Sequence, residues 1–127
     1  MAKVYVSSHD VDRAREVAVA IEASGQVDTT TWHIGDGPAM RSANLTDADK
    51  RDKARANCGQ IAMADVLVVV AADDKVPGGK FVEAGFAIGR GKSVVVVGRR
   101  ENILMHHPKV TQVDDVAAAV EACRATA

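Results

Sequence analysis

The residue best placed to do chemistry in this chain is a glutamate that follows a glycine-rich turn. Gly78 and Gly79 end an acidic turn, and Glu83 lies in the first turn of a helix expected over residues 80–90. The dipole of a helix stabilises an ionised carboxylate near its N-terminus, which suits a nucleophile or a group that stabilises a developing cation. The same dipole also favours glutamate on a solvated surface, so position alone leaves both interpretations open.

The apolar residues of this expected helix form a stripe that leaves out Glu83 and so directs it away from the core side of the helix. Three glycines make the segment a poor helix former, because each costs about 1 kcal/mol relative to alanine in a helix interior. We attribute Gly85 to a close approach of the helix to the sheet, and Gly91 to the end of the helix. The stripe consists of Phe81, Ala84, Gly85 and Ile88.

Polar groups also follow two other expected strands, in the segments 7–10 and 98–102. Ser7, Ser8 and the backbone N–H groups at the start of the next helix are suited to hold an anion. Arg13, in the first turn of that helix, would add a positive charge. Capping of the helix by Ser8 or Asp10 explains the first segment equally well.

The elements that must position these residues alternate between strand and helix. The run 66–70 is unbroken in its apolar character, which is typical of a central strand covered on both faces. Alanine, valine and isoleucine recur at helical spacing after Asp10, and Gly25 is a natural stop for that helix. The other expected strands are residues 3–7, 27–33, 94–97 and a short edge strand at 109–113, and the other expected helices are 47–63, 80–90 and 114–125.

This alternation predicts an α/β fold of three layers, with a doubly wound sheet of four to five mainly parallel strands. We expect a flavodoxin-like or Rossmann-like arrangement with right-handed crossovers and helices on both faces. In such folds ligands bind outside the carboxyl ends of the strands. The three polar segments all leave those ends, so a binding site is expected there.

The length of 127 residues indicates a single domain that spans residues 1–127. A net charge of −1, with both signs interspersed, gives no support for nucleic-acid binding. The apolar runs are of strand length, well short of the roughly 20 residues that span a bilayer, so no membrane partner is expected. The N-terminus lacks the pattern of a secretory signal, which favours the cytoplasm.

Three stretches of the chain resemble the nucleoside 2-deoxyribosyltransferase family. They are ADVLVVV, the acidic turn that follows it, and GGKFVEAGFAIGRGKSVVVVG, which contains the pattern GG-x-x-x-E-x-G-x-A-x-x-x-GK. The later stretch RRENILMHHPKV is similar to small phage and bacterial members. The resemblance covers residues 1–113 loosely and residues 64–108 well.

The resemblance implies that Glu83 attacks the anomeric carbon of a nucleoside or nucleotide. A second acid would help the base leave, and we assign that role to Asp74, with Asp73 as the other candidate. A solvated position in the turn explains either residue equally well. The sequence departs from the family at Asn57, where relatives often carry aspartate. We retain Asn57 as a substrate-binding residue.

The resemblance also extends to the substrate pocket. It implies substrate contacts from Ser7, Ser8 and Arg13, and Asn102 matches a position that reaches across a dimer interface in relatives. We therefore expect a homodimer or higher homo-oligomer with shared active sites, and a small nucleoside or nucleotide as the ligand. Gly78 and Gly79 complete the expected substrate-binding set.

Base exchange and hydrolysis both fit this pattern, and two other functions stay open. The stretch VSSHDVDRAREVAVAIEASG weakly resembles the start of Toll/interleukin-1 receptor domains, some of which cleave NAD. The substitution at Asn57 leaves room for a non-catalytic nucleotide-sensing module on the same scaffold. No cofactor is expected, because GRGKS precedes a strand and so is no P-loop. No metal is expected either, because the adjacent His106 and His107 point to opposite sides of an extended chain.

Overall fold

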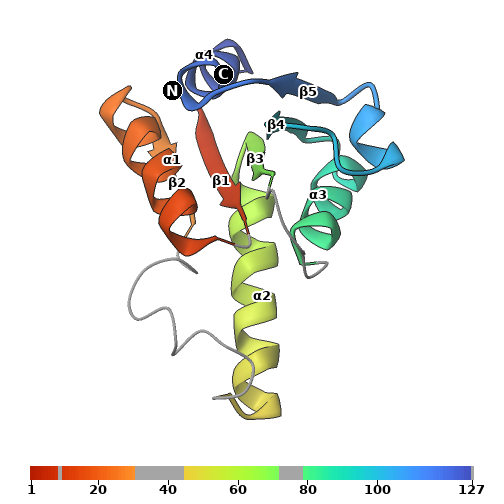
Figure 1. The fold of residues 1–127 in the computed structure, drawn as a ribbon. Helices are drawn as coiled ribbons and strands as arrows, with labels where there is room; N and C mark the ends of the chain where they lie inside the picture. Colours follow the sequence, from red (N-terminus) through yellow and green to blue (C-terminus); the bar gives the residue numbers. More distant parts are fainter. Residues whose placement is uncertain (9, 31–44, 72–78, 127) are drawn as a thin grey trace.

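A five-stranded parallel sheet forms the middle layer of the protein (Figure 1). The computed structural model describes residues 1–8, 10–30, 45–71 and 79–126. The strands are β1 (Lys3–Ser7), β2 (Val27–Asp28), β3 (Val66–Val70), β4 (Ser93–Val97) and β5 (Val110–Val113). The helices are α1 (Val11–Ala23), α2 (Asp47–Met63), α3 (Gly79–Gly89), the short 3-10 helix η3 (Ile103–His106) and α4 (Val116–Thr126).

The strands lie in the order β2-β1-β3-β4-β5, and every pair is parallel. This is the flavodoxin-like order, in which the direction of winding reverses between β1 and β3. The carboxyl ends of these two strands therefore border the crevice where ligands bind in folds of this kind. The predicted three-layer, doubly wound parallel sheet is confirmed.

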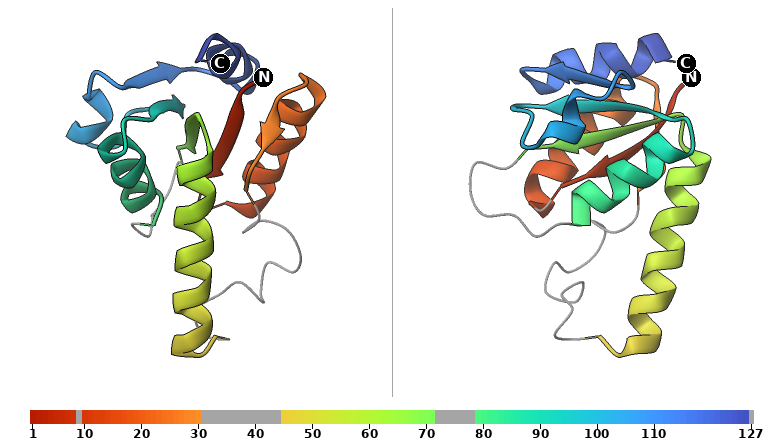
Figure 2. Two further views of the ribbon diagram at one scale, coloured as in Figure 1. Left: turned by 180° about the vertical axis from the view of Figure 1, so that it is seen from behind. Right: turned by 90° about the vertical axis from the view of Figure 1, so that its right-hand side faces the viewer.

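The two faces of the sheet bury separate apolar cores, and β3 contributes to both because all five of its residues are buried. Figure 2 shows the sheet with α4 on one side and α3 on the other. The α1 and α4 side is built from small side chains such as Val17 and Cys123. The α2 and α3 side holds Tyr5, Leu67 and Met105. The predicted stripe of α1 is confirmed, because Ala14, Val17, Ala18 and Ile21 are all buried.

The long helix α2 packs on the domain only through its last turns. Ile61 is its one buried residue, and the N-terminal half extends away from the sheet in both views (Figures 1 and 2). Thr46 and Asp49 close a reciprocal capping box at its start. This end of α2 is therefore held by local hydrogen bonds and charge, and not by burial.

The second strand is shorter than predicted. Residues 27–33 were expected to be extended, but β2 contains only Val27 and Asp28, and the part of the prediction beyond residue 30 lies outside the described residues. The hydroxyl of Thr30 accepts a hydrogen bond from the N–H of Val6, at 2.7 Å. A side chain thereby takes the donor that a further step of the β1–β2 ladder would have used.

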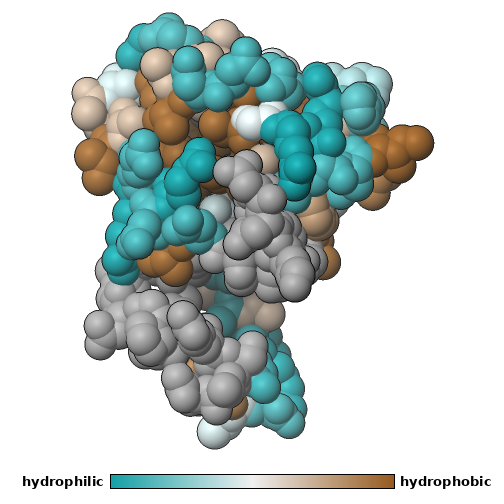
Figure 3. Space-filling view, viewed as in Figure 1, coloured by the Kyte–Doolittle hydropathy of each residue, from teal (hydrophilic) through white to brown (hydrophobic). Residues whose placement is uncertain are grey.

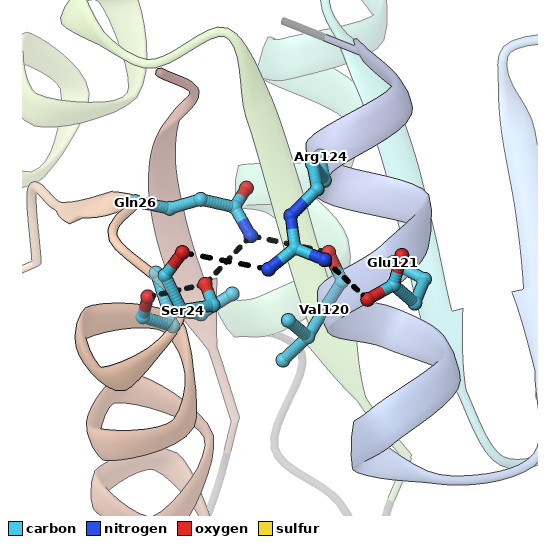
Figure 4. Close-up of polar contacts among 6 residues, drawn as sticks. Ser24, Gln26, Val120, Glu121 and Arg124 are labelled. Carbon is cyan, nitrogen blue, oxygen red and sulfur yellow. Dashed lines mark hydrogen bonds and ion pairs between the residues drawn. The ribbon is translucent and has the colours of Figure 1, made fainter.

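A polar cluster joins α1 to α4 at the edge of the sheet opposite the carboxyl ends (Figure 4). Gln26 is almost fully buried and donates hydrogen bonds to Ser24 Oγ at 2.9 Å and to the carbonyl of Val120 at 3.1 Å. Arg124 pairs with Glu121 on the exposed side of α4.

Among the described residues, no helix is long and apolar enough to cross a membrane.

Candidate active site

The carboxylate of Glu83 is held by two hydroxyl groups of β1. Tyr5 donates its phenolic hydrogen to Oε2, and Ser7 donates its hydroxyl hydrogen to Oε1 at 2.7 Å. Tyr5 and Ser7 are both fully buried, while Glu83 is half-buried. The carboxylate therefore lies at the carboxyl end of β1, with its orientation fixed by one donor on each oxygen.

The pleat of β1 explains why these two hydroxyls act on the same group. Side chains two residues apart on a strand point to the same face, so Tyr5 and Ser7 both face α2 and α3. Val4 and Val6, which alternate with Tyr5 and Ser7 along the strand, belong to the core on the opposite face of the sheet. Because β1 lies beside β3 at the point where the winding reverses, the triad of Tyr5, Ser7 and Glu83 borders the expected ligand crevice.

Burial and hydrogen bonding act in opposite directions on Glu83. Burial raises the pKa of its carboxyl group above the ordinary value of 4.5, and the hydrogen bonds from Tyr5 and Ser7 partly offset the rise. The pKa of the Tyr5 phenol is raised far above its ordinary value, first by burial and then by the charge of Glu83. Tyr5 is therefore a hydrogen-bond donor at any physiological pH, and not a base.

The orientation of Glu83 differs from the sequence prediction. Helix α3 begins at Gly79, which places Glu83 in the second turn, and its first turn contains no acidic residue. The helix dipole acts mainly on the first turn, so burial outweighs it and the pKa rises. Glu83 also faces the sheet, on the side of Lys80 and Ala87, and not away from it.

The explanation of Gly85 by a close approach to the sheet was wrong. Gly85 is exposed, and a methyl group placed on it would have no neighbour within 4 Å. Of the predicted stripe, Ala84 is buried and Phe81 and Ile88 are partly buried against the same core. The fully buried face also includes Lys80 and Ala87, so it is turned by about one residue relative to the prediction. The prediction for Gly91 is confirmed, because it ends the helix with a φ of 75°.

The N-terminus of α1 is capped by the side chain of Asp10. Asp10 accepts hydrogen bonds from the backbone N–H groups of Asp12 and Arg13, at 3.0 and 3.2 Å. Ser8 accepts one from the N–H of Asp10 at 3.0 Å. The interpretation of this segment as a helix cap is thus confirmed, with Asp10 as the cap. The hydroxyl of Ser7 is directed to a different partner, the carboxylate of Glu83.

The other predicted site residues that the structure describes lie on separate elements. Asn57 is half-buried on α2, four residues before the buried Ile61, which places both on one face of the helix. Asn102 caps η3, with its side-chain oxygen 2.9 Å from the N–H of Leu104. Gly79 is the first residue of α3. Asp73, Asp74 and Gly78 lie outside the described residues.

Two residues of the site were missed by sequence reasoning. Tyr5 was interpreted only as a strand residue, although its spacing of two from Ser7 predicts a shared face. Lys80 was placed in the expected helix without any role, yet it is buried and pairs with Glu101. Within the described residues, no cluster of three or more His, Cys, Asp or Glu side chains could hold a metal ion.

No family model and no curated protein matches the sequence, but solved structures do. A 2-deoxyribosyltransferase from Bacillus psychrosaccharolyticus superimposes with a TM-score of 0.71 at 18% identity, over 94% of this chain and 90% of its own. A conserved protein from Enterococcus faecalis V583 gives 0.67 at 16% identity, over 100% and 99%. A CMP N-glycosidase from Clostridium botulinum gives 0.62 at 13% identity, over 94% and 96%.

This chain has their fold. Because coverage is nearly complete in both directions, the likeness extends over the whole domain and not over a common sheet alone. The flavodoxin-like strand order is consequently the scaffold on which the two named neighbours carry out reactions at nucleosides or nucleotides. At these identities the chemistry of this chain must be argued from its own residues.

Proposed function

We propose that this protein is an enzyme that cleaves the N-glycosidic bond of a nucleoside or of a nucleoside 5′-monophosphate, with Glu83 as the nucleophile. The observation that carries the proposal is the half-buried Glu83 carboxylate, bound by Tyr5 and Ser7 at the winding reversal of the sheet. A carboxylate that is costly to bury and still held in one orientation is typical of a catalytic group. The fold shared with an N-glycosidase and a deoxyribosyltransferase supports the reaction class.

The reaction follows the logic of retaining glycosidases. An oxygen of Glu83 forms a bond to C1′ of the sugar, and the C1′–N bond to the base breaks with its electron pair leaving on the base. A proton donor neutralises the departing base. Water, or a nitrogen of a second base, then attacks C1′ and releases the carboxylate, which gives hydrolysis in the first case and base exchange in the second.

Tyr5 and Ser7 prepare Glu83 for this attack. Their hydrogen bonds favour the ionised form of the carboxyl group, against the effect of burial. Each oxygen retains a lone pair, because a carboxylate accepts about four hydrogen bonds and each oxygen here accepts one from β1. We therefore assign Ser7 to the orientation of the nucleophile, in place of the substrate contact expected from the sequence.

The remaining roles are proposed from position and chemistry. Asp74 would protonate the departing base, since it belongs to the segment that joins β3 to α3. Asn57 would hydrogen-bond the base or the sugar from α2. The remaining candidates for sugar or phosphate contacts are Ser8, Arg13, Gly78, Gly79 and Asn102.

We also propose a cytoplasmic homodimer that completes the site near Asn102. The two residues after it, Ile103 and Leu104, are strongly exposed, at 83% and 66%. Figure 3 shows an apolar projection at the right-hand edge, where the segment between β4 and β5 lies in Figure 1. Covering such side chains with a second copy would remove apolar surface from water beside Asn102. Sedimentation of the wild type and of Leu104→Glu tests this arrangement, because the charged variant should be monomeric.

The reaction is tested by following base release chromatographically. Purified protein is incubated with single 2′-deoxynucleosides plus a second base, with deoxynucleoside and ribonucleoside 5′-monophosphates, and with NAD. Glu83→Gln is assayed in parallel, with Glu16→Gln, an exposed glutamate on α1, as the matched control. We expect base release by the wild type and the control, and a loss of at least about 1,000-fold in Glu83→Gln, as for removal of a nucleophile.

The assay separates the possible functions. Appearance of a new nucleoside identifies base exchange, and free sugar without it identifies hydrolysis. Cleavage of NAD alone would favour the receptor-domain type of glycohydrolase. Binding of nucleotides without any cleavage would identify a sensing module, and it would overturn the proposed reaction.

A further inference from the structure

The first turn of α3 buries an ammonium group that the proposed reaction does not use. Lys80 is 4% exposed, and its Nζ lies 2.5 Å from Oε1 of Glu101. The side chain of Glu101 is itself only 10% exposed, so both charges of the pair are withdrawn from water. The ammonium also lies 5.1 Å from the ring centre of Phe81. Breaking such a pair by removing one partner is strongly destabilising, because the other charge is left buried without its counter-charge.

The pair lies on the same face of α3 as the proposed nucleophile. Lys80 and Glu83 are three residues apart, which places them on one side of the helix, and Ala84 and Ala87 complete that buried side. The two charged side chains reach different parts of the sheet. Glu83 contacts β1, and Lys80 contacts Glu101, in the segment that follows β4.

Because of the order of the strands, these two contacts hold the beginning of α3 from two sides. Strand β3 lies between β1 and β4, so the beginning of α3 is tied to the protein on both sides of β3. The helix itself offers little to hold its first turn in place. Glycines stand at positions 79, 85 and 89, and a methyl group on any of them would contact nothing within 4 Å. Local helix propensity and glycine packing therefore do not fix the position of Glu83.

We propose that Lys80 is a positioning residue, whose ion pair with Glu101 holds the first turn of α3 so that Glu83 stays in contact with Tyr5 and Ser7. The expected effect of Lys80 on the reaction rate rests on the proposed function of Glu83. Its expected effect on the contact between Tyr5 and Glu83 is independent of that function. The pair also fixes the backbone directly before Asn102, so it aligns two segments of the site that the sequence keeps about twenty residues apart.

Tyr5 is the one tyrosine of the chain, which allows its contact with Glu83 to be observed alone. With tyrosine labelled by carbon-13 at Cζ, the protein gives a single tyrosine resonance, and its position reports the hydrogen bond of the hydroxyl group. Glu83→Gln defines the position without the carboxylate. We expect Lys80→Met to move the resonance toward that of Glu83→Gln at neutral pH, because the helix turn is no longer held.

The same variants are compared in single-turnover base release. A displacement of the nucleophile should lower the rate constant on the order of 10- to 100-fold with little change in KM. Glu121→Gln removes the carboxylate of an exposed ion pair on α4, with Arg124 (Figure 4), and serves as the matched control. It should leave both the resonance and the rate at their wild-type values.

Lys80→Met places an uncharged side chain against the largely buried Glu101 carboxylate and can prevent folding, so Glu101→Gln is the second variant. Its amide oxygen still accepts a hydrogen bond from Lys80, and we expect a smaller displacement of the resonance in the same direction. If the folded variants keep the wild-type resonance, or lose rate only in proportion to the unfolded fraction, Lys80 is a structural residue and the proposal is wrong. A wild type without glycosidic activity would refute the proposed function, and the resonance would still decide the role of Lys80.

Discussion

Tyr5 and Glu83 form a hydrogen bond between the first strand of the sheet and the third helix, although 78 residues separate them in sequence. Tyr5 is completely buried and its phenol keeps its proton, so it is a permanent donor to the carboxylate. Together with Ser7 it favours the ionised form of a carboxyl group whose burial favours the neutral form. The pKa of Glu83 is consequently set by β1 as well as by burial.

The pH dependence of base release should respond to Tyr5. The proposed reaction requires the ionised form of Glu83. Its raised pKa should place the acidic limb of kcat/KM above the pH expected for an ordinary glutamate. Tyr5→Phe removes a hydrogen bond that lowers this pKa, so the limb should move to higher pH. At neutral pH we expect a loss of roughly 10-fold or more, from a hydrogen bond to a charged group. A limb that stays in place would show that another group titrates.

Ser7→Ala should move the acidic limb in the same direction, because the Ser7 hydroxyl also lowers the pKa of Glu83. Ser93→Ala is the matched control, since Ser93 begins β4 at the opposite edge of the sheet. The measurement is the pH profile of kcat/KM for the three proteins. If Ser7→Ala raises KM and leaves the limb unchanged, Ser7 contacts the substrate as the sequence first suggested.

Glu83 should make the protein less stable at neutral pH than it would be without the charge. Its pKa in the folded state is raised above the unfolded value, so stability is greatest below the unfolded pKa and decreases as pH rises toward the folded pKa. Thermal melting of Glu83→Gln and wild type, at about pH 4 and about pH 7, tests this linkage. The Tm of the variant relative to wild type should be higher at pH 7, and an equal difference at both values would contradict it.

Gly98 directly follows β4, and we expect its replacement to destabilise the fold. Its φ of 102° is one that residues with a side chain rarely adopt, and an added methyl group would lie 3.1 Å from Cβ of Ala71. Gly98→Ala should lower the free energy of unfolding by about 1–3 kcal/mol, the usual cost of a strained backbone. Gly59→Ala is the control, because a methyl group at this position of α2 would have no neighbour within 4 Å. It should leave the free energy of unfolding unchanged or raise it. Urea denaturation measures this free energy for both variants.

The alternation of elements along the chain was enough to predict the sheet, because apolar periodicity is a local property. The unbroken apolar run of β3 and the stripe of α1 were confirmed in position and burial. The end of β2 was not predictable in this way. The hydroxyl of Thr30 replaces a backbone partner there, and that contact depends on β1 lying beside it.

The surroundings of Glu83 were harder to predict than the sheet. Glu83 was singled out by its place after two glycines together with the family resemblance, but its predicted direction was wrong because the helix begins at Gly79 and the buried face includes a lysine. A buried Lys80 contradicts the polar pattern and becomes understandable only with Glu101 beside it. Tyr5 likewise needed its partner. A single sequence does not reveal contacts between residues that are distant along the chain, such as Tyr5 with Glu83 and Lys80 with Glu101.

The central claim is that the glycosyl group is transferred to Glu83. A 2′-fluoro-2′-deoxynucleoside slows the release of such an intermediate, because the fluorine destabilises the cation-like transition state. After a short incubation and acid quench, the protein is digested and its peptides are analysed by mass spectrometry. We predict a peptide heavier by one fluorinated deoxypentosyl group with the modification on Glu83, and none in Glu83→Gln. Release of the base with an unmodified Glu83, or a modification on another residue, would contradict the claim.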